Sequence, residues 1–355
     1  MKTYKLQTFV AEGKEIFVGL EDSKKTWKIA VRCDRMLIHQ ASMEAKYPAL
    51  LGYLRNKFPG CAIHVIYEAG LKGFNLYDLL VKDGIDCIVI PPHLVTEPKI
   101  TKVKTDKRDA RRLALILENH DYADPCHVPD RERREDRQVS RTLIGIQKDI
   151  IRTRNRIHRL LDFHGIEVSS PRWGRTEFRA LKQLSLDEPL RISLDVLLDQ
   201  LEELWARQIV LRSALRALCR KERYRKAFEI ARSMPGIGWL SAIRLILEFG
   251  EDLSHFTSGK KIASFVGLTS SEHSTGETER KGRITGMGSG FVRALLVENA
   301  WVAIRKDRVL LSKFSRVWRS SGSKKKAIVA VARMMIVRFR ACVTAGAPYR
   351  IGTAQ

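Results

Sequence analysis

Cysteine is scarce in this sequence, and none of the six cysteines belongs to a Cys-x-x-Cys pair. Their scatter favours small buried side chains in a reducing compartment over a disulfide framework or a zinc site. Long apolar runs are also missing: the best one, from Ala327 to Val337, is too short to span a bilayer and contains Arg333. The first residues lack the apolar stretch of a signal peptide. We therefore expect a soluble, cytoplasmic protein with no membrane partner.

Acidic residues are few relative to basic ones, with 40 Asp and Glu against 64 Lys and Arg, which gives a formal net charge of +24. The imbalance is greatest toward the C-terminus, where Glu298 and Asp307 are the only acids after Arg280. Such an excess attracts polyanions without specifying a fold. A chain of 355 residues with 44% apolar residues has room for two or three domains. The composition predicts a nucleic-acid-binding protein.

Strand and helix patterns alternate in the first third of the chain, which predicts an α/β domain with a mixed sheet. The strand patterns cover 16–40, 62–67 and 87–90, and the helical patterns cover 50–58 and 74–81. The polar link at 21–25 is short enough for a hairpin. In such sheets, ligands gather beyond the strand ends.

Acidic side chains fall at comparable places in this pattern. Glu21 ends the first strand, Glu68 ends a middle strand, and Asp106 and Asp109 open a predicted helix on one of its faces. Carboxylates in basic surroundings, with Arg108 between the two aspartates, suit Mg²⁺ and phosphate chemistry. Each acid taken alone is equally well explained as a turn or helix-start residue. Together the four acids are a candidate metal site.

Two long helices are predicted in the middle of the chain. Residues 129–164 are rich in arginine, and residues 190–218 carry four heptads with Leu at each d position and Gln208 as the one polar a residue. Such heptads predict a coiled coil, formed either within one chain or between copies. Arginines predicted on the outer face of the first helix are candidates for phosphate contact: Arg131, Arg133, Arg134, Arg137, Arg141, Arg152, Arg154, Arg156 and Arg159.

Glycine-rich segments mark the last third. The segment Pro235-Gly236-Ile237-Gly238 resembles a helix-hairpin-helix turn, in which backbone N–H groups at Gly236 and Gly238 hold a phosphate. A tight connection between two helices would need the same glycines. A long loop is predicted from Gly267 to Gly290. It offers two candidate nucleophiles, Ser274 and Thr275, and three candidate phosphate-binding cations, Arg280, Lys281 and Arg283. A flexible surface loop would have a similar composition.

Several motifs, taken in order, resemble the transposases of insertion-sequence family one-hundred-ten, in the eleven-eleven subgroup, to which pilin-gene-inverting recombinases are related. The motifs are Val18-Gly19-Leu20-Glu21-Asp22-Ser23-Lys24-Lys25, Tyr67-Glu68-Ala69-Gly70, Lys104-Thr105-Asp106-Lys107-Arg108-Asp109-Ala110, Pro235-Gly236-Ile237-Gly238 and Phe265-Val266-Gly267-Leu268-Thr269, followed by the Ser-Thr-Gly loop. The resemblance covers nearly the whole chain.

This resemblance implies a multidomain α/β plus α protein. Residues 1–128 would form an RNase-H-like (RuvC-like) DEDD catalytic domain, residues 129–222 a coiled-coil region for dimerisation and nucleic-acid binding, and residues 223–355 a mostly helical transposase domain with the serine/threonine loop. It further implies Mg²⁺ bound by Glu21, Glu68, Asp106 and Asp109. The implied partners are donor and target DNA, a structured non-coding guide RNA and further copies of the chain in a dimer or tetramer, near the bacterial nucleoid.

Two positions depart from the family pattern. The first acid is usually Asp, whereas Glu21 stands here and is followed by Asp22, a second candidate for that ligand. The nucleophile usually directly precedes Gly, a place held here by Thr275, with Ser274 one residue earlier. Either hydroxyl would attack a DNA phosphate and give a phosphoserine-type link. Two alternatives stay open: a Holliday-junction-resolvase-like nuclease that uses metal-activated water, and a non-catalytic nucleic-acid-binding protein.

Overall fold

The computed structural model describes residues 13–70, 72–92, 106–122, 125–167, 174–275 and 278–352. Two compact units divide the chain, residues 1–128 and residues 129–355. None of the helices in these described ranges is long and apolar enough to cross a membrane.

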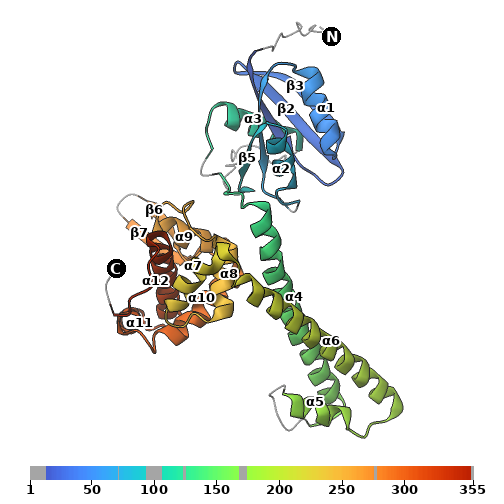
Figure 1. The fold of residues 1–355 in the computed structure, drawn as a ribbon, viewed down its shortest axis with the longest axis vertical. Coiled ribbons are helices and arrows are strands. Elements are labelled where there is room, and N and C mark those ends of the chain that lie inside the picture. Colours follow the sequence, from blue (N-terminus) through green and yellow to red (C-terminus); the bar gives the residue numbers. More distant parts are fainter. Residues whose placement is uncertain are drawn as a thin grey trace. The chain divides into compact units, whose positions relative to one another are not determined.

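A five-stranded mixed sheet forms the centre of the N-terminal unit (Figure 1). The strand order is β3-β2-β1-β4-β5, with β2 antiparallel to β1 and β3, and with β4 parallel to β1 and β5. The strands are β1 (Glu15–Glu21), β2 (Thr26–Cys33), β3 (Met36–Glu44), β4 (Ala62–Glu68) and β5 (Asp86–Ile90). The helices are α1 (Tyr47–Lys57), α2 (Asn75–Lys82) and α3 (Asp106–Glu118). The predicted α/β class with a mixed sheet is confirmed.

Side chains alternate along the central strand β1, so successive residues lie on opposite faces of the sheet. Val18 and Leu20 are buried in the same cluster as Leu50 of α1 and Leu80 of α2. Gly19 lies between them and faces α3. The sheet is therefore covered by α1 and α2 on one face and by α3 on the other.

The second unit is mostly helical in its described part. Helix α4 (Arg131–Phe163) packs against α6 (Glu188–Leu218), with α5 (Arg175–Lys182) beside them. The long helices thus pair within one chain, one of the two arrangements that the heptads allowed. The remaining helices are α7 (Glu222–Ser233), α8 (Trp239–Phe249), α9 (Gly259–Val266), α10 (Gly290–Ala303), α11 (Arg308–Ser321) and α12 (Lys324–Ala345), which share one large apolar core.

Two antiparallel strands replace much of the long loop predicted between Gly267 and Gly290. They are β6 (Ser270–Thr275) and β7 (Thr278–Ile284). The prediction of one long loop was wrong for these residues because their backbones pair with one another, and a glycine next to them serves close packing. Gly267 has a φ of +74°, and a Cβ there would lie 2.0 Å from the carbonyl oxygen of Met287.

Candidate active site and nucleic-acid-binding surfaces

Helix α3 can lie close to the sheet because Gly19 has no side chain. A Cβ built on Gly19 would lie 2.1 Å from the carbonyl oxygen of Ala110 and 2.3 Å from the backbone nitrogen of Ala114. Ala110, Ala114 and Ala30 of β2 are all buried together. We call these four residues the small-residue seam. In the sequence Gly19 stands out only as a motif residue, and its packing role is visible in the structure.

The other end of α3 is fixed by Glu118. The Arg32 Nε donates a hydrogen bond to Glu118 Oε2 at 2.6 Å, and the Arg35 backbone N–H donates to Oε1 at 2.7 Å. Both side chains of the ion pair are well shielded, with 15% of Arg32 and 6% of Glu118 exposed. The seam and this ion pair together determine where the start of α3 lies on the sheet.

The four predicted acids occupy the end of the sheet at which β1 and β4 finish. Glu21 and Glu68 are the last residues of these two paired parallel strands. Because side chains alternate, Glu21 lies on the same face as Gly19, which is the face that α3 covers. Asp106 and Asp109 are in the first turn of α3. We call Glu21, Glu68, Asp106 and Asp109 the acidic cluster.

The pKa of Glu21 reflects the charges of the other members of the acidic cluster. Burial, followed by the negative charges of Glu68, Asp109 and Asp106, raises the pKa of the Glu21 carboxyl to about 7 from its ordinary 4.5, with a last contribution from Asp22. Among the residues that the structure describes, no three acidic, histidine or cysteine side chains lie close enough to enclose a metal ion. The cluster is a set of neighbouring carboxylates and not a closed ligand cage.

Asp22, the second candidate for the first acid, has a different environment. Burial raises the pKa of its carboxyl, and the Lys72 ammonium opposes that rise. Lys72 Nζ donates to the Ser23 carbonyl at 2.6 Å and lies 5.2 Å from the centre of the Trp27 ring. Of the two candidates, Glu21 is the residue whose pKa responds to the other members of the acidic cluster.

The two candidate nucleophiles lie in the C-terminal unit. Ser274 and Thr275 are the last residues of β6, with their backbones in register with Glu279 and Thr278 of β7. The predicted phosphate-binding cations are all on β7: Arg280, Lys281 and Arg283. One strand pair therefore carries both the hydroxyls and the cations. Gly276 of the Ser-Thr-Gly motif, like Lys104 and Thr105 of the third motif, lies outside the described residues.

Arg293 of α10 holds the base of this strand pair. One of its terminal nitrogens donates to the carbonyl oxygens of Val266, at 2.9 Å, and Met287, at 2.7 Å. These carbonyls flank β6 and β7 in the chain, so Arg293 ties the two ends of the strand pair together. This role could not be predicted from the sequence, because a single arginine in a basic segment gives no distinguishing signal.

The two glycines of the turn between α7 and α8 have different roles. Gly236 has a φ of +81°, and a Cβ there would lie 2.3 Å from the carbonyl oxygen of Asn299, so this glycine permits packing against α10. Gly238 is exposed, precedes α8 without a side-chain cap, and has open space where a Cβ would stand. Of the pair predicted to hold phosphate, Gly238 has the open helix start that such contact needs.

Two arginines of α6 lie beside the start of α8. The guanidinium carbons of Arg212 and Arg216 are 5.4 Å and 4.4 Å from the centre of the Trp239 ring. Trp239 is the first residue of α8. The open helix start at Gly238 is thereby bordered by two cations, which sequence analysis did not single out.

Part of the arginine-rich face predicted on α4 forms ion pairs with acidic residues of the same chain. Arg133 is 5% exposed and pairs with Glu251 at 3.7 Å. Arg137 and Arg141 pair with Glu248 at 3.9 Å and 3.2 Å. The prediction of an outer face was wrong for Arg133 and Arg137, because this half of α4 packs against α8 and its acidic C-terminal end. Arg141 does lie on an outer face, since half of its side chain is exposed.

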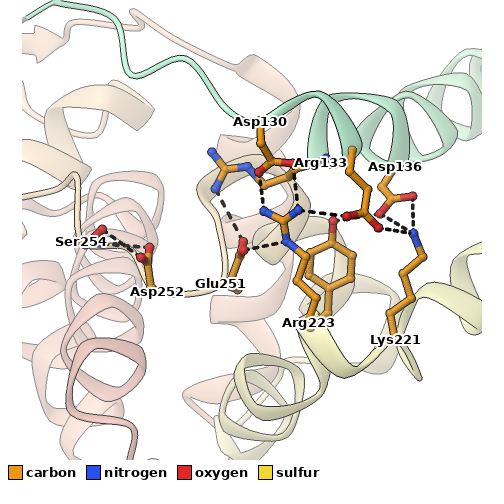
Figure 2. A network of polar contacts seen from close by, with 10 residues as sticks. Asp130, Arg133, Asp136, Lys221, Arg223, Glu251, Asp252 and Ser254 are labelled. Atoms are coloured by element: carbon orange, nitrogen blue, oxygen red, sulfur yellow. Dashed lines mark hydrogen bonds and ion pairs between the residues drawn. The ribbon is translucent and has the colours of Figure 1, made fainter.

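Ionic contacts also fix the start of α4 (Figure 2). Arg223 of α7 donates to Asp130 Oδ1 at 2.8 Å and to Glu251 Oε1 at 2.7 Å, and Asp130 caps α4 by accepting from the Arg133 backbone N–H at 2.9 Å. The Arg223 guanidinium holds the pKa of Asp130 well below its usual range. We call Asp130, Arg133, Arg223 and Glu251 the α4 clamp.

The far half of α4 keeps exposed cations. Arg152 and Arg156 are exposed, and Arg152 pairs with Asp149 in the preceding turn. Arg154 is only partly exposed and lies 5.7 Å from the centre of the Trp205 ring of α6. The predicted arginines of this helix that stay exposed are Arg131, Arg141, Arg152, Arg156 and Arg159. Arg108 is likewise exposed, on α3.

Comparisons with known proteins match both units. The DEDD transposase model of IS110, described as "Transposase", matches residues 23–166, and the model described as "Transposase IS116/IS110/IS902 family" matches residues 228–316. The first match includes Glu68, Asp106 and Asp109 and begins just after Glu21.

Relatives over most of the chain are transposases by name. A candidate transposase of Sinorhizobium fredii, y4qE, is 27% identical over 93% of this chain and 83% of its own length. The transposase of element IS1533 of Leptospira borgpetersenii is 24% identical over 71% of this chain and 74% of its own. The transposase of IS1111A of Coxiella burnetii is 24% identical over 69% and 66%.

The two units therefore define an enzyme that acts on DNA, of the transposase class. More particularly, the chain belongs to the IS110 family of insertion-sequence transposases, the insertion-sequence family one-hundred-ten that its motifs resemble. The DEDD model also points to a divalent metal.

Proposed function

We propose that this transposase uses the acidic cluster as a Mg²⁺ site in an RNase-H-like domain, and that Ser274 or Thr275 attacks DNA. The observation that carries the metal proposal is the placement of the four acids, at the ends of the paired strands β1 and β4 and in the first turn of α3. The raised pKa of Glu21, about 7, agrees with this placement. Like charges held this close are stabilised by a bound dication, and carboxylate oxygens are the ligands that Mg²⁺ prefers. When bound, Mg²⁺ would stabilise negative charge on the reacting phosphate.

The topology of the sheet supports the RNase-H-like assignment. Three antiparallel strands are followed by two strands parallel to the first, in the order β3-β2-β1-β4-β5. The acids lie at the ends of the paired strands β1 and β4 and at the start of α3. Residues from three parts of the sequence thus reach one edge of the sheet, where α/β proteins bind ligands.

In the proposed reaction the hydroxyl oxygen of Ser274 or Thr275 bonds to a DNA phosphorus. The bond from that phosphorus to the 3′ oxygen breaks, and the 3′ oxygen takes up a proton, which leaves the 5′ phosphate linked to the protein. Attack by another 3′ hydroxyl reverses the exchange and rejoins DNA, so no outside energy source is needed. In this proposal the cations of β7, the strand paired with the one that carries the hydroxyls, would offset the phosphate charge.

The proposal extends to a structured guide RNA and to a dimer or tetramer. Its support is the net charge of +24, the exposed Arg152 and Arg156 of the helix pair, and the open start of α8 at Gly238. Helix α6 also leaves apolar side chains exposed that a second copy could cover: Ile192, Val196, Ile209 and Val210. In this proposal residues 129–222 dimerise and bind nucleic acid, and residues 223–355 carry the nucleophile.

Trapping a covalent adduct tests the nucleophile. A suicide DNA substrate, nicked near the cut site, should leave a protein–DNA adduct that survives denaturing gels. Comparing Ser274→Ala with Thr275→Ala identifies the attacking residue, and Thr275→Ser should retain the adduct if Thr275 attacks. An adduct formed equally by both alanine variants and by their double mutant would contradict the assignment and favour a nuclease that uses water.

Asp109→Asn tests the acidic cluster in the same assay. The amide keeps the size of the side chain and removes one negative charge, so we expect strand cleavage to fall by at least about a hundredfold while DNA binding persists. Unchanged cleavage would contradict the metal proposal. Asp121→Asn, at an acid beyond the end of α3, is the matched control.

A further inference from the structure

Three aromatic side chains form a row across α10 and α11. The ring centre of Trp301 is 5.6 Å from that of Phe314, which is 6.0 Å from that of Trp318. Phe314 is buried, whereas Trp301 is 38% exposed and Trp318 is 42% exposed. The buried ring therefore holds two indoles that present their surface to solvent. We call these three residues the aromatic row.

The surroundings of this row are basic. The chain from Arg305 to Lys326 carries these cations: Arg305, Lys306, Arg308, Lys313, Arg316, Arg319, Lys324, Lys325 and Lys326. None of them makes an ion pair with a carboxylate among the described residues. One cation touches the row directly, since Lys324 Nζ lies 4.9 Å from the centre of the Trp318 ring.

The single acid of this stretch, Asp307, does not offset the charge at the surface. It is 1% exposed and accepts a hydrogen bond from the Tyr349 hydroxyl at 2.5 Å. It also caps α11 by accepting from the Val309 backbone N–H at 2.8 Å. The exposed indoles therefore lie beside an excess of positive charge, with the exposed Glu298 one turn before Trp301 on α10 as a single opposing acid among the described residues of α10 to α12 outside Asp307.

We propose that the aromatic row binds unpaired nucleotides, with bases stacked on Trp301 and Trp318 and phosphates contacting the neighbouring cations. A second copy of the chain would bring the same positive charges against these, which opposes self-association here. A polyanion with flat π faces fits both the charge and the rings. In a duplex those faces are already stacked on one another, so single-stranded DNA or unpaired RNA is the form that can use the row.

This inference goes beyond the proposed function, because it needs neither the acidic cluster nor the hydroxyls of β6. It can therefore be tested in EDTA, where no metal-dependent step takes place. The adduct assay on Ser274 and Thr275 is a separate measurement, so failure of one proposal leaves the other standing.

The test measures binding of the full chain to labelled oligonucleotides by fluorescence anisotropy. The probes are a mixed-sequence single-stranded RNA, the matching single-stranded DNA, and a blunt DNA duplex of the same length. We expect Trp318→Ala to weaken single-strand binding by about tenfold and duplex binding by much less, since one base–aromatic stack contributes about that factor. Trp318→Phe should keep most of the affinity, and Leu311→Ala, which removes an exposed apolar side chain of α11, should change neither.

The pattern across probes decides the outcome. A loss confined to RNA identifies an RNA strand as the occupant, and an equal loss for RNA and DNA identifies unpaired bases of either kind; both support the proposal. An equal loss for the duplex and the single strands would overturn it, as would full affinity in the Trp301→Ala, Trp318→Ala double variant with an unchanged circular dichroism spectrum. A change from oligomer to monomer with single-strand affinity intact would assign the row to a second copy and also overturn it.

Discussion

Glu21 is the residue in which position and charge are most closely linked. It ends a central strand, faces the start of α3, and has a carboxyl whose pKa is raised to about 7 by burial and by its acidic neighbours. A proton on Glu21 and a cation beside it are alternative ways to reduce the same repulsion. The charge state of this site should therefore depend on both pH and divalent metal.

We predict that Glu21→Gln stabilises the metal-free protein in a pH-dependent way. In acid the Glu21 carboxyl is protonated in both the folded and the unfolded state. Its pKa is 4.5 in the unfolded state and about 7 in the folded state, so between these values the unfolded state releases the proton first and the free energy of unfolding falls as pH rises. Glu21→Gln has no carboxyl at this position and should not lose stability in this way. Its free energy of unfolding in urea with EDTA should exceed that of the parent at about pH 8 and match it at about pH 4.

Mg²⁺ should remove most of this difference at the higher pH, because a bound dication offsets the charge of the carboxylate. Glu15→Gln, at the exposed other end of β1, serves as the control. A variant at Glu21 that is less stable than the parent at about pH 8 in EDTA would contradict the electrostatic explanation.

Among single residues, the positions of the acids could be predicted from the sequence better than those of the buried cations. Strand ends and helix starts are marked by the apolar pattern, so the positions of the acidic cluster could be predicted. Arg133 was misplaced because its burial depends on Glu251, which is more than a hundred residues away in the sequence. Gly19 and Arg293 were missed because their roles depend on backbone atoms of distant segments.

Among the elements, α3 has the most direct effect on the candidate active site. Its approach to the sheet is set by the small-residue seam, and it carries half of the acidic cluster. A side chain at Gly19 would meet backbone atoms of Ala110 and Ala114, which cannot move without displacing the helix. The spacing between the acids of the strands and those of α3 depends on this contact.

We predict that Gly19→Ala lowers the free energy of unfolding by about 3 kcal/mol and reduces strand cleavage, because the added methyl group forces α3 away from β1. The matched control is Gly52→Ala in α1, where nothing lies within 4 Å of the new methyl group. That change should be neutral or stabilising by up to about 1 kcal/mol. Urea unfolding of both variants makes the comparison, and equal effects would contradict the packing argument.

The α4 clamp gives a second prediction at the scale of elements. Arg223→Ala leaves Asp130 and Glu251 without their main cation, so we expect a loss of about 2 kcal/mol in the free energy of unfolding. Arg225→Ala removes an exposed pair with Glu222 on the same helix and should cost less than about 0.5 kcal/mol.

Acid should remove much of the effect of Arg223→Ala. The pKa of Asp130 is depressed in the folded state, so its ion pair stabilises the fold above the ordinary Asp pKa and loses that contribution as pH falls. Urea unfolding of both variants at neutral and acidic pH measures this. Similar losses for Arg223→Ala and Arg225→Ala would mean that the clamp does not stabilise the start of α4.

Long helices and buried strands could be predicted because their apolar period is strong, and α4, α6 and the strands of the mixed sheet lie close to the predicted ranges. The pair β6 and β7 could not, since its residues are mostly polar and its pairing is not visible in an apolar pattern. Gly267 and Gly288 were placed within one long loop, although a Cβ at either would meet backbone atoms at 2.0 Å.

For the whole molecule, the two units are the main organising feature. The N-terminal unit has its own core, in which Val18, Leu50 and Val65 are fully buried. We predict that residues 1–128 expressed alone fold and show one cooperative thermal transition. A shorter fragment ending at residue 92 lacks α3 and exposes the seam, so it should not show such a transition. Calorimetry of both fragments tests this, and a non-cooperative melt of the longer one would contradict it.

The most shielded ionic side chains around α4, those of Arg133 and Glu248, bear on how the protein can be purified. A chain of charge +24 will carry cellular nucleic acid, and the usual remedy is a wash in concentrated salt. Salt screens exposed charges far more than shielded ones, and the Arg133 and Glu248 side chains of the contacts around α4 are less than a tenth exposed. The solvent-facing cations of α11 and α12 have no such protection. There should therefore be a range of salt concentration that removes nucleic acid from the surface while the ion pairs of Arg133 and Glu248 around α4 persist.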